Sequence, residues 1–496
     1  MYLIRVRSFG ATQQPAVRIQ QPTGGGYSTK RPELPSVKNH YQLAVVGAGS
    51  GGQEAALVAA KEGLKVLLVE KDTLGGTCLH HGCYPVRALR ACAEATKDRQ
   101  RDAKYGLENA GTPVGFEKWL TVQRRVSARL TQEVNNQLER AGVSVRFANA
   151  SLTAPNQLHI ASSHGEVDQI EADYIVVATG SRPSFDQFRP GSRYVNSDSL
   201  LARADIPGHL VIVGGGYIGC EFASIFRSLG SVVTLVEKED RLLPNWDASL
   251  GEHLEACLRS AGVNVQLGYE IDLPIPGELL EEPDFALRTG TRISPDLVLL
   301  ATGRKPNIEN LGLENLGIKT NPFVVVNEQL QTNSPNIFAV GDINGLSLLD
   351  SAAVVQARIA IGTIFGRKER FSARWIPRCI HTDPPIASIG WNEEDAARAG
   401  LDVISHSQAF RLVTDDERTV VNPLPTMVKI LLQAESRQIL GVHVVGTAAA
   451  EIVNLGSMAV RAGFTLDQVL QVPLVHPSAT EVFQECAHGL GRIPVG

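Results

Sequence analysis

Two segments of this chain repeat one pattern, in which an apolar strand leads into a glycine-rich turn, a helix and a second apolar strand. The first covers residues 41–70 and has three glycines and a terminal acid at defined positions: Gly47, Gly49, Gly52 and Glu70. In such a βαβ unit the glycines permit a tight turn, close approach of a pyrophosphate and close helix–strand packing. The phosphates then lie at the helix N-terminus, and the acid can accept the hydroxyls of an adenosine ribose.

The second segment covers residues 209–237 and has the same residues at matching positions: Gly214, Gly216, Gly219 and Glu237. From 47 to 70 and from 214 to 237 the spacing is the same, and it is typical of dinucleotide-binding units. A carboxylate at the end of the second strand favours a free ribose 2′-hydroxyl and repels a 2′-phosphate. We therefore expect NAD at this unit, with NADP as the alternative because Lys238 and Arg241 follow closely.

Length and composition limit the possible classes of protein. A chain of 496 residues is too long for one hydrophobic core, so about three domains are expected. A hydrophobic content of 43% and a net charge of -5 fit neither a disordered chain nor a basic nucleic-acid binder. No apolar run is long enough to predict a membrane helix. Seven cysteines, an odd and sparse set, favour a reducing compartment, and we expect a cytoplasmic protein.

Residues 1–40 differ in composition from the rest of the chain. They carry six Arg or Lys residues against the single acid Glu33, and they are rich in Gln, Gly and Pro. We interpret this segment as a flexible N-terminal arm. An Arg-rich, acid-poor composition is also typical of transit peptides, so a mitochondrial matrix location is the alternative.

Three further apolar strands end in short polar motifs. The segments "YIVVATGSRP", with Thr179 and Gly180, and "LVLLATGRKPN", with Gly303, are suited to chain crossings between domains. The strand "NIFAVGD" ends at Asp342, whose carboxylate either binds a polyol hydroxyl or caps the following turn.

After Arg367 the pattern changes to strand-like runs followed by an apolar helix near 449–463, which indicates a separate α+β domain. Its last motif, "LVHPSATEVFQE", places His476 five residues before Glu481. A histidine beside a carboxylate suits acid–base catalysis, although a lone histidine is more often structural.

The stretch "GGTCLHHGCYPVR" contains Cys78 and Cys83, and three interpretations compete for them. Zinc binding is disfavoured because structural zinc sites usually combine two separated ligand pairs. Inert buried thiols are disfavoured by the neighbouring nucleotide-binding pattern. A redox pair has a mechanism, since a helix predicted to start near Cys83 would place its thiolate at a helix N-terminus, where a thiol pKa is lowered.

The segment "GGTCLHHGCYP" resembles the active-site segment of the flavin-dependent pyridine nucleotide-disulfide oxidoreductases, most closely the dihydrolipoamide dehydrogenase branch. With both glycine fingerprints, the ATG segments, the GD motif and the C-terminal HPxxxE, the resemblance covers about residues 41–492. It implies FAD and NAD as cofactors. It also implies two Rossmann-like dinucleotide-binding domains and a C-terminal α+β dimerisation domain, an α/β fold overall.

The resemblance also implies residue roles. Cys78 resembles the interchange thiol and Cys83 the thiolate beside the flavin, while His476 resembles the acid–base group that Glu481 orients. Because this histidine comes from the partner subunit in the family, a homodimer is implied. The residues implied at FAD are Gly47, Gly49, Gly52, Glu70, Gly76, Thr77, Arg87, Thr179, Gly180 and Asp342. Those implied at NAD are Gly214, Gly216, Gly219, Glu221, Glu237 and Gly303.

Some positions depart from the family pattern. A lysine that pairs with the glutamate after the second fingerprint is replaced by Arg87, with Glu221 available as its partner. In the helix after the GD motif, the family's A-H and E-G positions are occupied by other residues: Asp350, Ser351, Gln356 and Ala357. Residues 269–296 also look shorter than the family's segment. These departures suggest a specialised lipoyl or disulfide partner.

The resemblance predicts the domains and the reaction. We expect an arm at 1–40, an FAD-binding domain at 41–186 and 299–368, an NAD-binding domain at 187–298 and an interface domain at 369–496. The tail has no cysteine pair of the mercuric or large thioredoxin reductase type, and Gly219 and Glu237 favour the lipoamide branch over glutathione reductase. We expect oxidation of a dihydrolipoyl group by NAD⁺. The alternatives are an NAD(P)H-dependent reductase of another small disulfide and a flavoprotein with altered or lost activity.

Overall fold

The computed structural model describes residues 39–104, 116–186, 188, 192–271, 285–286, 292–410 and 426–491. The predicted arm at 1–40 lies outside these residues, except for its last two positions. Most of the segment 269–296, predicted to be short, also lies outside them. Within the described residues, no helix is long and apolar enough to cross a membrane.

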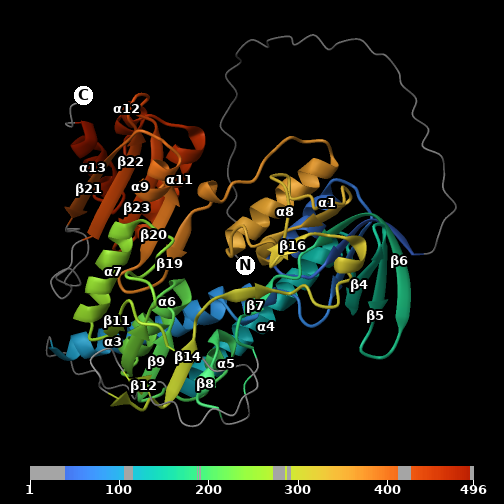
Figure 1. The fold of residues 1–496 in the computed structure, drawn as a ribbon, viewed down its shortest axis with the longest axis horizontal. Helices are drawn as coiled ribbons and strands as arrows, with labels where there is room; N and C mark the ends of the chain where they lie inside the picture. Colours follow the sequence, from blue (N-terminus) through green and yellow to red (C-terminus); the bar gives the residue numbers. More distant parts are fainter. Residues whose placement is uncertain are drawn as a thin grey trace, which may run out of the picture. The chain divides into compact units, whose positions relative to one another are not determined.

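The first sheet contains the first fingerprint (Figure 1). Its order is β3-β2-β1-β6-β5-β4, and β18 also pairs with β6. Strands β4, β5 and β6 are labelled in Figure 1. The strands are β1 (His40–Val46), β2 (Val66–Glu70), β3 (Ser144–Phe147), β4 (Asn149–Ala154), β5 (Gln157–Ala161), β6 (Val167–Val177) and β18 (Ile337–Ala339). Strands β3, β2, β1, β6 and β18 pair in parallel, whereas β5 pairs antiparallel with both β6 and β4.

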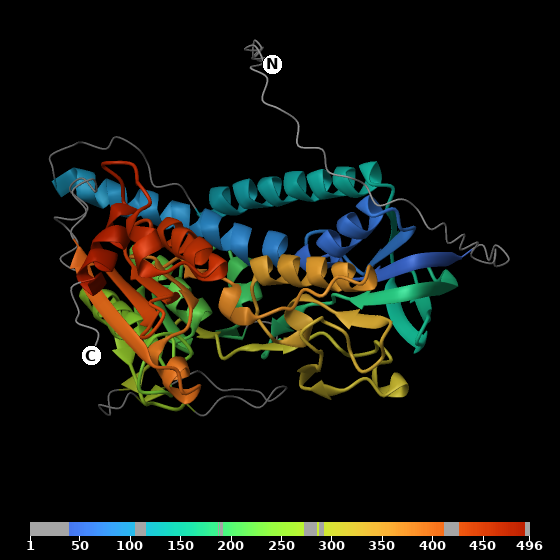
Figure 2. The ribbon, with the colours of Figure 1, turned by 90° about the horizontal axis from the view of Figure 1, so that it is seen from above.

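The helices associated with this sheet are α1 (Ser50–Lys61), α2 (Gly76–His80), α3 (Cys83–Lys104), α4 (Phe116–Arg140) and α8 (Asp350–Ile364). Helix α3 starts at Cys83, which confirms the predicted start. The long helices α3 and α4 contact one another (Figure 2). Buried side chains from β1, β2, α1 and α8 form one of the cores of this region.

The second sheet is wholly parallel and has the order β11-β10-β9-β14-β8. Its strands are β8 (Tyr194–Val195), β9 (His209–Val213), β10 (Val232–Val236), β11 (Asn264–Gln266) and β14 (Leu297–Leu300), with helices α5 (Ser197–Leu201), α6 (Tyr217–Ser228) and α7 (Ala248–Ser260). All four residues of β14 are buried, as expected when helices cover both faces of a parallel sheet. The predicted domain boundary after residue 298 falls within β14, and all four residues of this strand pair with β9.

The third sheet has the order β19-β20-β23-β22-β21, and all its strand pairs are antiparallel. Its strands are β19 (Arg378–Ile380), β20 (Ile386–Gly390), β21 (Val403–Phe410), β22 (Thr426–Gln433) and β23 (Ile439–Val445), with helices α9 (Glu393–Arg398), α11 (Ala449–Ala462), α12 (Leu466–Leu470) and α13 (Glu481–Gly491). Helix α11 confirms the helix predicted near 449–463.

Short elements complete the described chain. They are the pairs β7 (Ser181–Pro183) with β15 (Arg304–Pro306), β12 (Phe285–Ala286) with β13 (Arg292–Ile293) and β16 (Thr320–Asn321) with β17 (Phe323–Val324), and the 3-10 helices η1 (Glu314–Leu316), η2 (Gly341–Asn344) and η3 (Ala373–Trp375). Strands β7 and β15 follow the two ATG segments and form an antiparallel ribbon. The predicted fold class, parallel Rossmann-like sheets with a C-terminal α+β domain, is confirmed.

Candidate active site

The first glycine fingerprint forms the turn that its sequence predicts. Gly47 has a φ of +101°, and a Cβ at this position would lie 2.4 Å from the carbonyl oxygen of Ala178. A Cβ on Gly52 would lie 1.9 Å from the carbonyl oxygen of Gly47, so only glycine allows α1 to pack this closely. Gly49 precedes α1, and nothing lies within 4 Å of the position of its Cβ. The helix N-terminus is therefore accessible to an anionic group.

The acids that close the two fingerprints have matching hydrogen bonds. Glu70 accepts one from the backbone N–H of Ala48 (2.7 Å) and one from that of Asp72 (2.9 Å). Glu237 accepts them from Gly215 (2.5 Å) and Glu239 (2.9 Å). Each carboxylate thus holds its glycine turn against the strand end. Each oxygen also retains a lone pair for a ribose hydroxyl.

A cavity of about 820 Å³ extends from the first fingerprint to the two cysteines. The residues implied at FAD that line it are Gly47, Gly49, Glu70, Gly76, Thr77, Thr179, Gly180 and Asp342. Gly52 and Arg87 are not among the described residues that line it, and Gly52 acts through packing instead. An open helix N-terminus at one end and polar groups along the wall fit FAD.

Asp342 lies in η2, directly after the core strand β18. Its Oδ2 accepts a hydrogen bond from the Ser181 hydroxyl (2.6 Å) and lies 4.0 Å from Nε of Arg304. Burial raises the pKa of this carboxyl, and the Ser181 bond and the Arg304 charge oppose the rise. Neither Ser181 nor Arg304 was predicted from the sequence. Each directly follows an Ala-Thr-Gly segment, and that position is the signal that could have revealed them.

The two ATG segments lie beside this cavity and are tied to each other. The Thr179 hydroxyl donates to the carbonyl of Asn307 (2.7 Å), and the Asn307 amide donates to the carbonyl of Thr179 (2.8 Å). Gly303 has a φ of +118°, and its carbonyl accepts from the N–H of Ser184 (3.0 Å). These contacts fix the ribbon of β7 and β15 at the wall of the cavity.

Cys78 lies in α2 and Cys83 is the first residue of α3, and both side chains line the cavity as free thiols. The two groups interact by a hydrogen bond, which lowers the pKa of Cys83 and raises that of Cys78. The structure therefore favours a state in which the Cys78 thiol donates to a Cys83 thiolate. Its position at the start of α3 stabilises the Cys83 thiolate further.

The two histidines between the cysteines line the same cavity. His80 lies 2.9 Å from the carbonyl oxygen of Leu74 through its Nε2, a contact that helps to shape the turn. In the described part of the chain, no three His, Cys, Asp or Glu residues are grouped to hold a metal ion.

Glu221 and Arg87 depart from the ion pair that the family pattern implies. Glu221 lies in α6 and accepts a hydrogen bond from the backbone N–H of His381 (2.6 Å). Burial raises the pKa of Glu221 to about 7, against that hydrogen bond and the charges of Arg90 and Arg87. Arg87 is exposed and forms no ion pair with a described residue, so the expected pairing is corrected to a longer-range interaction.

His476 and Glu481 form the predicted pair. Nδ1 of His476 lies 2.7 Å from Oε1 of Glu481, and the N–H of Ser478 donates to Oε2 (2.8 Å). The hydrogen bond from His476, with that from Ser478, lowers the pKa of Glu481. The His476 side chain is 83% exposed, and neither residue is among the described residues lining the cavity. The pair therefore lies on an exposed surface and outside the lining of the cavity that holds Cys78 and Cys83.

The second fingerprint is built like the first. A Cβ on Gly219 would lie 1.8 Å from the carbonyl oxygen of Gly214, and Gly216 precedes α6 with nothing within 4 Å of its Cβ position. This accessible helix N-terminus and Glu237 fit a dinucleotide.

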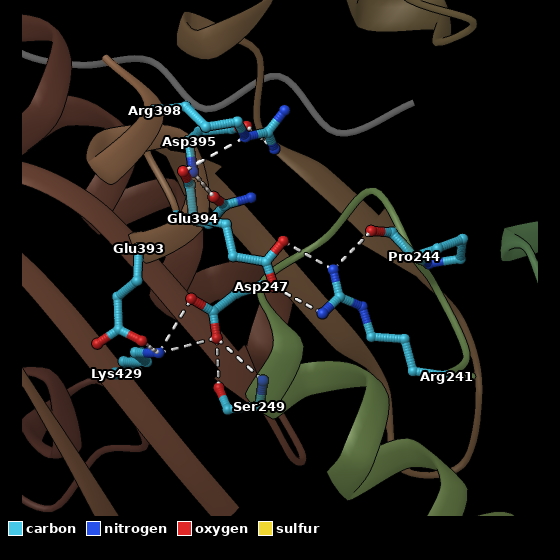
Figure 3. A network of polar contacts seen from close by, with 10 residues as sticks. Arg241, Pro244, Asp247, Ser249, Glu393, Glu394, Asp395, Arg398 and Lys429 are labelled. Atoms are coloured by element: carbon cyan, nitrogen blue, oxygen red, sulfur yellow. Dashed lines mark hydrogen bonds and ion pairs between the residues drawn. The ribbon is translucent and has the colours of Figure 1, made fainter. Parts of the chain in front are cut away.

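Arg241, the basic residue that left NADP open, is already paired (Figure 3). It binds Glu394 of α9 through two hydrogen bonds of 2.6 and 2.8 Å, and it also donates to the carbonyl of Pro244 (3.1 Å). Lys238 is exposed, and its Nζ lies 3.7 Å from a carboxylate oxygen of Glu239.

Comparisons with known proteins agree with this architecture. Residues 41–361 match the family model "Pyridine nucleotide-disulphide oxidoreductase", and residues 376–487 match its dimerisation domain. A dihydrolipoyl dehydrogenase of Chlorobaculum parvum is 32% identical over 457 residues, which cover 90% of this chain and 96% of that protein. A glutathione reductase of Burkholderia cepacia is 31% identical over 454 residues, covering 90% of this chain and 98% of that protein.

Solved structures give the same fold. LpdA from Mycobacterium tuberculosis matches with a TM-score of 0.81 and 25% identity, over 91% of this chain and 99% of that one. The flavoprotein disulfide reductase RclA from Escherichia coli matches with a TM-score of 0.78 and 25% identity, over 91% of this chain and 100% of that one. The family implies FAD and a pyridine nucleotide, and its dimerisation domain implies a homodimer. The chain therefore belongs to the pyridine nucleotide-disulphide oxidoreductase family and is a flavoprotein disulfide oxidoreductase.

Proposed function

We propose that this chain oxidises dihydrolipoyl groups with NAD⁺ through a disulfide between Cys78 and Cys83. The observation that carries the proposal is the pairing of these cysteines within the cavity that starts at the first fingerprint. The dihydrolipoyl dehydrogenases among the relatives support the choice of substrate. FAD, when bound, supplies the two-electron carrier between the dithiol and the nicotinamide.

The residues act in a defined order. His476 of the partner subunit in a homodimer takes a proton from one substrate thiol, and Glu481 keeps its imidazole in position. The substrate thiolate attacks Cys78, which breaks the Cys78–Cys83 bond and leaves Cys83 as a thiolate. Attack by the second substrate thiol on the mixed disulfide then releases the lipoyl disulfide and returns Cys78 as a thiol.

The contacts of Arg241 support NAD as the nucleotide. A 2′-phosphate needs a free cation, whereas Arg241 is held by Glu394 and the nearby Glu237 carries a negative charge. The predicted domain division, with the boundary after 298 moved beyond β14, belongs to the same proposal.

Steady-state assays of the purified protein distinguish the proposal from its alternatives. We expect NADH formation from dihydrolipoamide and NAD⁺, and little reaction of glutathione disulfide with NADPH. Cys78→Ser should lower the rate by at least about 10³-fold. The matched control, Cys92→Ser on the neighbouring helix α3, should retain most activity. Turnover only with glutathione disulfide and NADPH would support the alternative, an NAD(P)H-dependent reductase of a small disulfide. The glutathione reductase of Burkholderia cepacia motivates this alternative.

The third alternative, a flavoprotein that has lost activity, needs a different measurement. Anaerobic titration with NADH reports whether the bound flavin and the cysteine pair accept electrons, independently of any disulfide substrate. Absence of a long-wavelength charge-transfer band would favour this alternative.

A further inference from the structure

Asp350 brings a carboxylate to the redox cysteines. It is the first residue of α8 and lines the same cavity as Cys78 and Cys83. The hydroxyl of Ser50, the first residue of α1, donates a hydrogen bond to it. Two helix N-termini therefore meet at this carboxylate and stabilise its negative charge. The family pattern has an uncharged alanine at this position, so the charge is a departure of this chain.

Asp350 acts on both thiols. The largest causes that raise the pKa of Cys78 are its hydrogen bond to Cys83 and burial. The negative charges of Cys83 and Asp350 and a hydrogen bond to Asp350 raise it further by smaller amounts. For Cys83, the hydrogen bond from Cys78 lowers the pKa, whereas burial and the charge of Asp350 oppose this.

Other titratable groups surround the pair on the neighbouring elements. Glu221 and Tyr217 from α6 interact with Cys83 through their charges, and His80, His81 and Asp342 line the same cavity. Arg87 from α3 acts on Glu221. Glu221 adds a weaker negative effect on Cys83, and its own pKa is raised to about 7 by burial. Unlike these groups, Asp350 lines the cavity beside both cysteines and opposes the thiolate form of each.

We propose that Asp350, held by Ser50, disfavours the thiolate form of the reduced Cys78–Cys83 pair and makes this pair a stronger reductant. This inference rests on the proposed function in one respect, namely that these two cysteines are the redox pair. Asp350 acts as an electrostatic positioning residue.

The charge balance gives the direction of the effect. Reduction of the disulfide adds two electrons and one proton when Cys78 ends as a thiol and Cys83 as a thiolate. The disulfide is neutral and the reduced pair carries one negative charge, so a neighbouring carboxylate destabilises the reduced pair selectively. At a pH low enough to protonate both thiols, the reduced pair is neutral and the effect of Asp350 disappears.

Two measurements on the purified holoenzyme test this role. The first is the pH dependence of iodoacetamide alkylation of the reduced pair, with Cys78 and Cys83 peptides quantified by mass spectrometry. The second is equilibration with mixtures of oxidised and reduced dithiothreitol, followed by counting of alkylated thiols. Neither requires a lipoyl substrate or a nucleotide.

The expected result concerns Asp350→Asn. Its alkylation midpoint should fall by about one pH unit, since a neighbouring like charge shifts the pKa of a thiol by about that amount. The equilibrium constant for reduction should rise about tenfold at a pH where the thiolate is present, which corresponds to about 30 mV for this couple. Asp350→Glu should restore most of both values. Asp467→Asn, which removes an exposed acid from the first turn of α12, is the matched control and should change neither.

The outcomes separate this role from others. Equal midpoints for Asp350→Asn, Asp467→Asn and the natural protein would overturn the proposal. If Asp350→Asn fails to fold, Ser50→Ala should still shift both values in the same direction by a smaller amount, and no shift there would also overturn it. If both values shift in Asp350→Asn but the natural protein does not turn over dihydrolipoamide, the proposed substrate is wrong and the proposed role of Asp350 stands. Absence of any reducible pair would reject the proposed function itself.

Discussion

A buried ion pair between Lys429 and Asp247 joins the second and third sheets, and its removal gives the most demanding stability prediction (Figure 3). Nζ of Lys429 in β22 lies 3.0 Å from both carboxylate oxygens of Asp247, the residue that precedes α7. It also lies 2.7 Å from Glu393 of α9. Lys429 is 5% exposed and Asp247 is 2% exposed. If one partner is removed, water can therefore hydrate the remaining charge only slightly.

Lys429→Met keeps the length of the side chain but removes its charge. Asp247 would then be buried with Ser249 as its remaining hydrogen-bond donor, through a backbone N–H at 3.1 Å and a hydroxyl at 2.5 Å. His443 lies 3.9 Å away, but burial lowers its pKa to about 4, so it supplies no positive charge at pH 7. Breaking a buried pair on one side costs about 3–5 kcal/mol, and we expect about 3 because Ser249 remains.

The assay is equilibrium unfolding in urea at pH 7, followed by the fluorescence of Trp246. This side chain directly precedes Asp247, is buried, and has the Arg378 guanidinium 4.5 Å from its ring centre. The double variant Lys429→Met with Asp247→Asn should recover about 2 kcal/mol, because no unpaired charge remains and asparagine still caps α7.

The matched control is Arg398→Met, which removes an exposed ion pair with Asp395 and should cost less than about 1 kcal/mol. If Lys429→Met lowers the free energy of unfolding no more than the control does, the buried carboxylate needs no counterion and the prediction is wrong.

Three further outcomes are expected. Burial lowers the pKa of His443 from 6.5 to about 4, so its stabilising effect is complete above pH 6.5 and is lost as pH falls through 4. The free energy of unfolding should therefore fall by about 3 kcal/mol between pH 7 and pH 4, and His443→Gln should reduce this fall. The pKa of Glu221 is raised to about 7, so its contribution is present below pH 4.5 and is lost as pH rises through 7; Glu221→Gln should remove about 3 kcal/mol of this decline in the same assay. Glu394→Gln weakens the ion pair that holds Arg241 and should raise kcat/KM with NADPH about tenfold. An unchanged ratio of kcat/KM for NADPH to that for NADH would show that Arg241 does not affect nucleotide specificity.

Local sequence patterns predicted the parts of the fold that depend on local chemistry. Both glycine fingerprints form as expected because each needs only a strand, a turn and a helix that are adjacent in sequence. The start of α3 at Cys83 and the pair of His476 with Glu481 also depend on residues close in sequence.

Contacts between distant segments could not be predicted in the same way. Arg241 is bound by Glu394, which is 153 positions away, and Glu221 accepts from the backbone of His381, which is 160 positions away. The meeting of Asp350 with Ser50 spans 300 positions. Each contact depends on how sheets and helices pack, and none leaves a periodic signal in the sequence.

The sequence shows that Gln356 departs from the family pattern, but it does not predict the contacts of this side chain. Gln356 replaces an acid of the family pattern, yet its Oε1 accepts hydrogen bonds from the N–H of Gly341 (2.7 Å) and the amide of Asn344 (2.8 Å). The side chain therefore still holds the turn that carries Asp342, without a buried negative charge.

The most direct test of the redox assignment is a count of reactive thiols at Cys78 and Cys83 before and after anaerobic reduction of the oxidised holoenzyme with one equivalent of NADH. We predict that both cysteines resist iodoacetamide before reduction and become alkylated after it, while the buried Cys220, Cys257 and Cys486 remain unmodified in both samples. Alkylation of Cys78 and Cys83 that does not depend on NADH would contradict the assignment of these two residues as a redox-active disulfide.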